Sequence, residues 1–206
     1  MVFHGNRAKI VFYRGSRFLV YPGVYEPAED TFLLADNLEF RSGERVLELG
    51  TGCGLLSILA AKAGARVVAT DINPVALECA RDNAVEHGVA GSIDFRLGDL
   101  FGPVRGESFD LLVFNPPYLP SEDGERSSDP VELAWDGGKD GRKVLDRFLR
   151  EFPHHLKPEG RAFFVQSSLS NVFQTKQMLE TNNFKFKALE KKLFFERLYL
   201  FICFRS

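Results

Sequence analysis

The most constraining feature of this chain is a short apolar run that leads through a glycine-rich turn into an apolar helix pattern. Arg45–Leu49 precedes Gly50–Gly54 (GTGCG), and residues 55–63 are apolar and rich in alanine. A strand, a glycine-rich turn and a helix form an arrangement in which the backbone approaches a ligand closely. A dinucleotide fingerprint would need its third glycine at the position of Leu55. The alternating glycines, with Glu48 just ahead of them, therefore predict a ligand-binding turn of another kind.

Two further predicted strands end beside acidic residues. Arg66–Thr70 predicts a strand that ends at Asp71, and Ile93–Leu97 predicts a strand that is soon followed by Asp99. A carboxylate at the end of the second strand can accept both hydroxyls of a ribose. Asp99 could accept from an adenine amino group, with the backbone N–H of Leu100 on a ring nitrogen, or it could be a turn residue.

The fourth predicted strand is the apolar run Phe109–Phe114, which ends in Asn115-Pro116-Pro117-Tyr118. Both prolines fix their own φ, and Pro116 biases Asn115 away from the helical region. The resulting stiff loop would hold an amide and several carbonyl oxygens in fixed directions. The Asn115 oxygen and the Pro116 carbonyl could each accept one N–H of a planar –NH2 group, on which Tyr118 could stack. An ordinary proline-rich turn explains the tetrapeptide alone equally well.

Periodicity and turn residues predict the other elements. Residues 119–138 are polar and irregular, which favours a lid or substrate-binding loop with Glu132 and Trp135 as candidate contacts. The acidic first turn at Glu29 and Asp30 fits helix capping. The remaining expected elements are a β-hairpin over Lys9–Tyr21, helices from Glu29 to Leu38, from Pro74 to about Gly88, over Gly141–Phe152 (ended by Pro153) and over Asn171–Asn182, a strand at Arg161–Val165, and an antiparallel pair over Phe184–Phe204.

This order of elements predicts a doubly wound α/β fold with a seven-stranded, mostly parallel, Rossmann-like sheet and an antiparallel C-terminal edge pair. With 206 residues, the chain fits one domain. We expect a small N-terminal hairpin extension over residues 1–23 and a core over 24–206.

Composition narrows the function classes. The chain is 45% hydrophobic and 26% charged, with a formal net charge of −2, so no global basic field favours binding to nucleic-acid phosphates. Three widely spaced cysteines without a CxxC pair argue against structural zinc and against a disulfide framework. The sequence shows neither a secretory leader pattern nor a long apolar span, which favours a cytoplasmic protein without a membrane partner.

The ligand-type residues occur in the order found in one enzyme class. Glu48, the glycines at 50, 52 and 54, Asp71 and Asp99 together resemble the class I S-adenosylmethionine-dependent methyltransferases. Four further stretches look like the HemK-type protein-glutamine methyltransferases, closest to the short archaeal and eukaryotic branch that modifies class 1 translation release factors. These stretches are Tyr25–Thr31 (YEPAEDT), Asp71–Pro74 (DINP), Asn115–Tyr118 (NPPY) and Trp135 with Gly137 and Gly138.

The resemblance runs from about Val24 to the C-terminus. The long helical N-terminal domain of the bacterial branch has no room here, because only about twenty residues precede the first matched motif. The chain departs from the family pattern at Asp136, where relatives carry a small residue.

The resemblance implies S-adenosylmethionine as cofactor and a role for each matched residue. Asn115 would hold the substrate amide within the Asn115-Pro116-Pro117-Tyr118 loop, and no metal would be required. The implied cofactor contacts are Thr31 at the methionine carboxylate, Glu48 at the amino end, Gly50, Gly52 and Gly54 beneath the cofactor, Asp71 at the ribose, and Asp99 with Leu100 at the adenine.

The resemblance also implies a protein substrate, a glutamine in a glycine-rich loop of a release factor, and a possible small zinc-binding activator subunit. Two alternatives stay open. The same tetrapeptide could hold an exocyclic amino group of adenine or cytosine in RNA or DNA, although the balanced charge favours a protein. A non-catalytic, cofactor-binding scaffold is the other, but a scaffold has no need of Asn115 and Tyr118.

Overall fold

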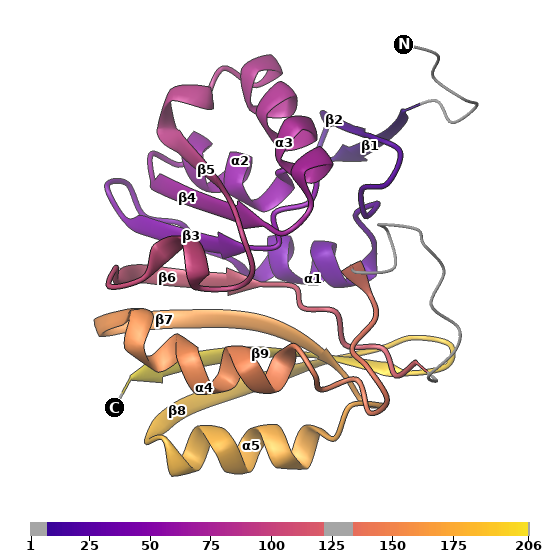
Figure 1. Cartoon of the computed structure of the whole chain (residues 1–206), viewed down its shortest axis with the longest axis vertical. Helices are drawn as coiled ribbons and strands as arrows, with labels where there is room; N and C mark the ends of the chain where they lie inside the picture. Colours follow the sequence, from indigo (N-terminus) through magenta and orange to yellow (C-terminus); the bar gives the residue numbers. More distant parts are fainter. Residues whose placement is uncertain (1–7, 122–133, 206) are drawn as a thin grey trace.

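The computed structural model describes residues 8–121 and 134–205. Within these ranges the chain forms a seven-stranded sheet flanked by helices and a separate two-stranded N-terminal sheet, as predicted (Figure 1). The strands are β1 (Lys9–Tyr13), β2 (Ser16–Val20), β3 (Arg45–Leu49), β4 (Arg66–Asp71), β5 (Ile93–Leu97), β6 (Phe109–Phe114), β7 (Leu156–Ser167), β8 (Phe184–Lys192) and β9 (Arg197–Arg205). The helices are α1 (Glu29–Asn37), α2 (Leu55–Lys62), α3 (Pro74–Glu86), α4 (Leu145–His155) and α5 (Val172–Thr181).

The strand order in the large sheet is β5-β4-β3-β6-β7-β9-β8. Neighbours from β5 to β7 are parallel, and β9 is antiparallel to both β7 and β8. The chain runs outward from β3 through β4 to β5 and then returns to the other side of β3 with β6. The order therefore reverses between β3 and β6, and open α/β sheets bind ligands beyond the carboxyl ends of the strands at such a point.

Strand alternation divides the core into two apolar clusters, one on each face of the sheet. In β3, Val46 belongs to the cluster shared with α1, α2 and α3, whereas Leu47 and Leu49 belong to the cluster shared with α4 and α5. The second cluster is rich in phenylalanine: the Phe148 ring lies 5.1 Å from Phe114 between ring centroids. Phenylalanine side chains therefore supply much of the packing on this face.

The N-terminal hairpin is attached to α3 through one buried amide. The Asn83 side chain accepts from Leu19 N at 2.8 Å and donates to the Leu19 carbonyl at 2.8 Å. It also donates to the Cys53 carbonyl at 2.8 Å. Asn83 thereby joins the hairpin, α3 and the glycine-rich turn.

The helix predicted over Gly141–Phe152 is wrong at both ends. The observed α4 begins at Leu145, because Gly141 adopts a left-handed φ of +70° that a regular helix cannot include. The helix also continues through Pro153 to His155. In the last turn the proline removes only one backbone hydrogen bond, and the buried His155 side chain still anchors the helix end.

Within the described ranges, none of the helices is long and apolar enough to cross a membrane.

Candidate active site

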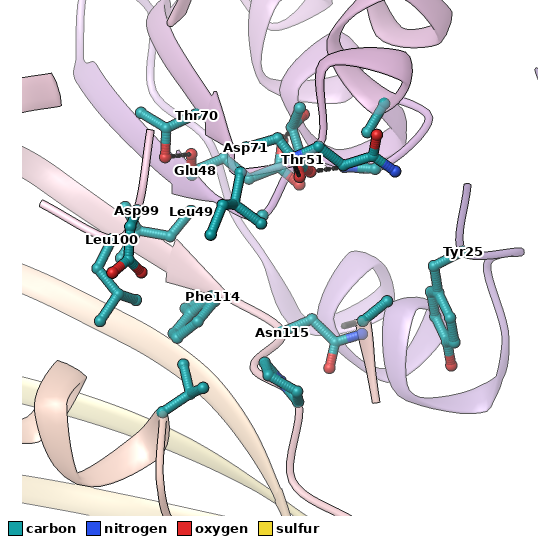
Figure 2. A pocket seen from close by; sticks show the side chains of 18 of the residues that line it. Tyr25, Glu48, Leu49, Thr51, Thr70, Asp71, Asp99, Leu100, Phe114 and Asn115 are labelled. Atoms are coloured by element: carbon teal, nitrogen blue, oxygen red, sulfur yellow. Dashed lines mark hydrogen bonds between the residues drawn. The ribbon is translucent and has the colours of Figure 1, made fainter. Parts of the chain in front are cut away.

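A cavity of about 280 Å³ lies where the carboxyl ends of β3, β4, β5 and β6 meet the start of α1. Figure 2 shows Asp99 and Leu100 at one end of this cavity and Asn115 and Tyr25 at the other, with Glu48 and Asp71 along one wall. Its size is near the lower end of small-molecule sites, about 300–1,000 Å³. The predicted site residues that line it are Thr31, Glu48, Gly50, Gly52, Asp71, Asp99, Leu100, Asn115 and Pro117.

Three predicted residues, Gly54, Pro116 and Tyr118, do not line this cavity. Gly54 instead forms the floor of the glycine turn, where a Cβ would lie 3.0 Å from the Ala80 Cβ. All three turn glycines are left-handed, with φ of +63° at Gly50, +56° at Gly52 and +85° at Gly54. The turn therefore needs glycine for its backbone conformation, and at Gly54 also for the close approach of α3.

Glu48 holds the glycine turn from inside. Its Oε2 accepts from Thr51 Oγ1 at 2.8 Å, from Ser57 N at 3.0 Å and from Ser57 Oγ. Complete burial raises the pKa of Glu48 to about 7, against the opposing effect of these hydrogen bonds. The carboxylate thus joins the end of β3 to the first turn of α2 while it lines the cavity.

Asp71 ends β4 with its carboxylate already oriented. Oδ2 accepts from Gly52 N at 3.0 Å, and Oδ1 accepts from Asn73 N at 2.9 Å. Burial raises the pKa of Asp71, and these backbone hydrogen bonds oppose the rise. A carboxylate offers about four lone-pair sites, so each oxygen keeps acceptor capacity for a ligand hydroxyl.

The far end of the cavity combines an apolar wall with an ion pair. Leu100 and Phe114 contribute apolar side chains, and Leu100 adopts a left-handed φ of +45° that turns the backbone after β5. Asp99 pairs with Arg147 at 2.6 Å. Sequence patterns gave no sign of this arginine, because it comes from α4, far along the chain.

Asn115 is fixed at the near end of the cavity by α1. Its Nδ2 donates to Thr31 Oγ1 at 3.4 Å. Its Oδ1 is buried and has no hydrogen-bond partner among the described residues. The cavity therefore contains one oriented acceptor whose bond is left unmade.

Asp30, which helix capping explains within the Tyr25–Thr31 stretch of the sequence, lies at the junction of α1 and the substrate loop. Its buried carboxylate accepts from Tyr118 Oη at 2.9 Å, from Tyr25 Oη at 2.9 Å and from Thr31 N at 2.6 Å. Burial, together with the charge of Asp30, raises the pKa of both tyrosines far above the ordinary value. Asp30 thus ties α1 to the end of the Asn115–Tyr118 loop.

Tyr118 lies in a second cavity, of about 380 Å³, together with Tyr25, Asp30, Leu119, Ala134 and Trp135. The first cavity does not include Tyr118, so the predicted stacking of its ring on a bound amide is not provided there. Trp135 is one wall of the second cavity, and Glu132 lies outside the described residues.

The segment around Trp135 pairs with the substrate loop through its backbone. Leu119 N donates to the Trp135 carbonyl at 3.0 Å, and Gly137 N donates to the Leu119 carbonyl at 2.9 Å. A Cβ on Gly141 would come within 2.3 Å of the Tyr118 carbonyl oxygen. Asp136, the departure from the family pattern, accepts from Gly138 N at 2.8 Å and from Ser121 Oγ.

The site fits S-adenosylmethionine by the chemistry of its groups. Asp71 can accept from ribose hydroxyls, Leu100 and Phe114 form an apolar wall suited to a base, and Gly50 and Gly52 present backbone without side chains to the cavity. The unpaired Asn115 Oδ1 lies at the opposite end, where it can accept from a substrate.

Comparisons with known proteins agree with this geometry. The family model described as methyltransferase small domain matches residues 17–128, more than half of the chain. A putative protein N5-glutamine methyltransferase of Methanocaldococcus jannaschii is 44% identical over 191 residues, which cover 92% of this chain and 95% of the relative. The methyltransferase HEMK2 of Homo sapiens is 42% identical over 173 residues, covering 78% of this chain and 79% of the relative.

A comparison with solved structures agrees with these sequence similarities. A chain of the E. cuniculi Mtq2–Trm112 complex is 28% identical and superposes with a TM-score of 0.69, covering 89% of this chain and 99% of that one. These similarities confirm the resemblance drawn from the sequence motifs. The chain therefore belongs to the methyltransferase small domain family and, within it, to the HemK-type S-adenosylmethionine-dependent protein-glutamine methyltransferases.

Proposed function

We propose that this enzyme methylates the side-chain amide nitrogen of a glutamine in a class 1 translation release factor. The observation that carries the proposal is the buried, unpartnered Oδ1 of Asn115 in the cavity wall. An unsatisfied buried acceptor costs about 1–3 kcal/mol, and a substrate N–H would supply the missing bond. A primary amide has two N–H groups on one planar nitrogen, which suits an acceptor of fixed direction.

Bound S-adenosylmethionine would supply an electrophilic methyl group on a positively charged sulfur, which would leave as a neutral thioether, and the amide nitrogen would give up one N–H proton to solvent. The chain's own residues would hold both reactants in place, and proximity with orientation accounts for much of the rate in such transfers. The residues proposed to hold the cofactor are Thr31, Glu48, Gly50, Gly52, Gly54, Asp71, Asp99 and Leu100.

Asn115 would act on the nucleophile. An amide nitrogen is a weak nucleophile because its lone pair is delocalised into the carbonyl. By accepting one N–H, Asn115 orients the nitrogen and stabilises the positive charge that develops there as the new bond forms. The Pro116 carbonyl remains a predicted second acceptor for the other N–H. Because Pro116 does not line the cavity, the loop would have to move to expose this oxygen.

The nature of the relatives supports a release factor as substrate. The E. cuniculi Mtq2–Trm112 complex is described as methylating the translation termination factor eRF1. A glutamine in a flexible glycine-rich loop could enter a recessed cavity that a folded surface could not. We also propose that a small zinc-binding activator subunit associates with this chain. We further propose that the enzyme works in the cytoplasm, where release factors act.

A side-by-side transfer assay tests the substrate class. Purified release factor, RNA and duplex DNA are each incubated with the enzyme and radiolabelled cofactor at low and moderate salt. We expect label on the release factor with weak dependence on salt. A nucleic-acid substrate would instead show a log–log salt slope of about −0.7 to −0.9 per neutralised phosphate, and labelling of RNA or DNA without the release factor would overturn the proposal.

A further inference from the structure

The tip of the β8–β9 hairpin carries two adjacent aromatic rings that the fold does not use. Phe194 is 92% exposed and Phe195 is 90% exposed. Their rings contact each other edge to face, with centroids 4.7 Å apart. The turn beneath them is well formed, since Leu193 N donates to the Glu196 carbonyl at 2.8 Å. The two rings are therefore presented to solvent on a firm support and add nothing to the core.

This tip lies next to the start of α1, the helix whose first residues contact the substrate loop. Lys191, at the end of β8, forms an ion pair with Glu29, the first residue of α1. The next two residues of α1, Asp30 and Thr31, hold Tyr118 and Asn115. Figure 1 shows the joined ends of β8 and β9 projecting on the side of the molecule where α1 lies.

A second contact ties the other arm of the hairpin to the same region. The Glu196 carboxylate accepts from Ser167 Oγ at the end of β7. After burial and Asp30, the negative charge of Glu196 also contributes to the raised pKa of Tyr25 and Tyr118. Both strands of the hairpin are thus anchored next to the residues that surround the substrate loop.

The charges around the two rings identify the kind of partner. Lys191 pairs with Glu29, and Arg197 pairs with Glu190 at 3.1 Å, whereas the exposed Lys192 has no ion pair among the described residues. Cations neutralised in this way give little attraction to phosphates or to anionic lipid headgroups, and one unpaired lysine adds only a weak charge. Two adjacent exposed aromatic side chains in this surround are instead typical of anchors that enter an apolar recess on a protein surface.

We infer that Phe194 and Phe195 form a docking surface for the body of the protein whose glutamine is methylated. The inference rests on the proposed function. A substrate that inserts one side chain into a recessed cavity must rest its folded part on the surface around it, and this tip, next to α1, carries the two most exposed large hydrophobic side chains among the described residues. Burial of the two rings would raise the affinity for the whole protein without contact to the reacting amide.

The test compares two substrates and one double variant, F194S/F195S. The substrates are a full-length class 1 release factor and a free peptide of about a dozen residues that contains only its glycine-rich loop and glutamine. Because both rings are about 90% exposed, the variant should fold normally, as thermal unfolding would verify. We expect KM for the full-length protein to rise at least about tenfold, with kcat, cofactor affinity and KM for the peptide unchanged.

Two matched variants test whether the effect depends on the apolar character of this tip. F194L/F195L keeps an apolar tip and should restore most of the affinity for the full-length protein. Phe12, which is 67% exposed in the separate N-terminal sheet, provides the control F12S, for which no change in KM is expected.

Three outcomes would overturn the inference: an unchanged KM for the full-length protein, an equal rise for the protein and the peptide, or a defect that disappears when a purified activator subunit is added in excess. The third outcome would assign the tip to the activator. If the wild-type enzyme methylated neither substrate, the proposed function itself would fail. If the wild type and the double variant were instead equally active on the full-length protein, only the docking inference would fail.

Discussion

Asn115 is held by Thr31 at one end of its amide and left unbonded at the other. The Nδ2–Oγ1 distance is 3.4 Å, while Oδ1 is buried without a partner among the described residues. One contact from α1 thus determines which way the loop amide faces. The unmade bond is consistent with a site built for a donor that arrives with the substrate.

Replacement of Asn115 by alanine should affect catalysis far more than cofactor binding. We expect kcat to fall by about 100-fold or more, the scale seen when one preorganised hydrogen-bonding group is removed from an active site. Cofactor affinity should change by less than about threefold. Steady-state kinetics together with calorimetric titration measure the two effects.

Asn37 offers a matched control for that variant. Its amide donates only to the Leu33 carbonyl, at 2.8 Å, outside the cavity. Asn37→Ala should leave kcat unchanged. A folded Asn115→Ala enzyme with near-normal turnover would remove Asn115 from the catalytic assignment.

Replacement of Asp71 by alanine should weaken S-adenosylmethionine binding at least about tenfold, or about 1.4 kcal/mol. The variant loses acceptors for the ribose and also the carboxylate that holds Gly52 N and Asn73 N. Asp71→Asn keeps one oxygen acceptor and should bind with intermediate affinity. Calorimetric titration that gave equal affinities for the wild type and both variants would exclude Asp71 from the cofactor site.

Glu48 should make stability fall as pH rises through the weakly acidic range. Its carboxyl keeps a proton up to about pH 7 in the folded protein, whereas the ordinary value is 4.5. Between these values the folded state binds more protons than the unfolded state, so the free energy of unfolding decreases with pH, by up to about 1.4 kcal/mol per pH unit. The contribution is fully present below pH 4.5 and lost above about pH 7.

Urea unfolding at several pH values between 4.5 and 7.5 measures this effect. Glu48→Gln can still accept from Thr51 and Ser57 but cannot ionise, so its pH dependence should be shallower than that of the wild type by the contribution of one group. Parallel curves for the two proteins would show that Glu48 titrates normally.

A methyl group at Gly141 should disturb the substrate loop from behind. The added Cβ would lie 2.3 Å from the Tyr118 carbonyl oxygen, at a φ of +70° that alanine adopts poorly. We expect Gly141→Ala to lower both stability and kcat. Gly106→Ala is the control, because its φ is +75° but no atom lies within 4 Å of the new Cβ. Gly106→Ala should lose about 1 kcal/mol of stability and no activity. Equal kcat values for the two variants would show that the Gly141 contact is unimportant for catalysis.

Most of the fold was predictable because local patterns agree with tertiary structure. The central strands β3, β4 and β6 are short, mostly apolar runs with turn residues at their ends, and Asn73-Pro74 starts α3 as expected, with Asn73 Oδ1 accepting from Val75 N at 3.0 Å. Glu48, Asp71, Asp99 and Asn115 converge because the carboxyl ends of parallel strands share one edge of the sheet.

The parts that could not be predicted depend on contacts between distant segments. The left-handed conformation of Gly141 beside the Tyr118 carbonyl keeps this residue out of α4, which no local pattern reveals. The role of Asp30 as the acceptor for two tyrosines depends on the meeting of α1 with the loop after β6. In the sequence, the helix dipole alone explains an acidic residue in the first turn of a helix. The sequence therefore gave no reason to expect that Asp30 also accepts hydrogen bonds from two tyrosines.

The most direct test of the account is to locate the transferred methyl group by tandem mass spectrometry. The enzyme is incubated with a purified class 1 release factor and isotopically labelled S-adenosylmethionine, and the digested substrate is sequenced. We expect one added methyl group, on the side-chain nitrogen of the glutamine in the glycine-rich loop, formed at least about 100-fold more slowly when Asn115→Ala replaces the wild type. A methyl group on any other residue of the release factor, or an unmodified release factor beside methylated RNA or DNA bases, would contradict the account.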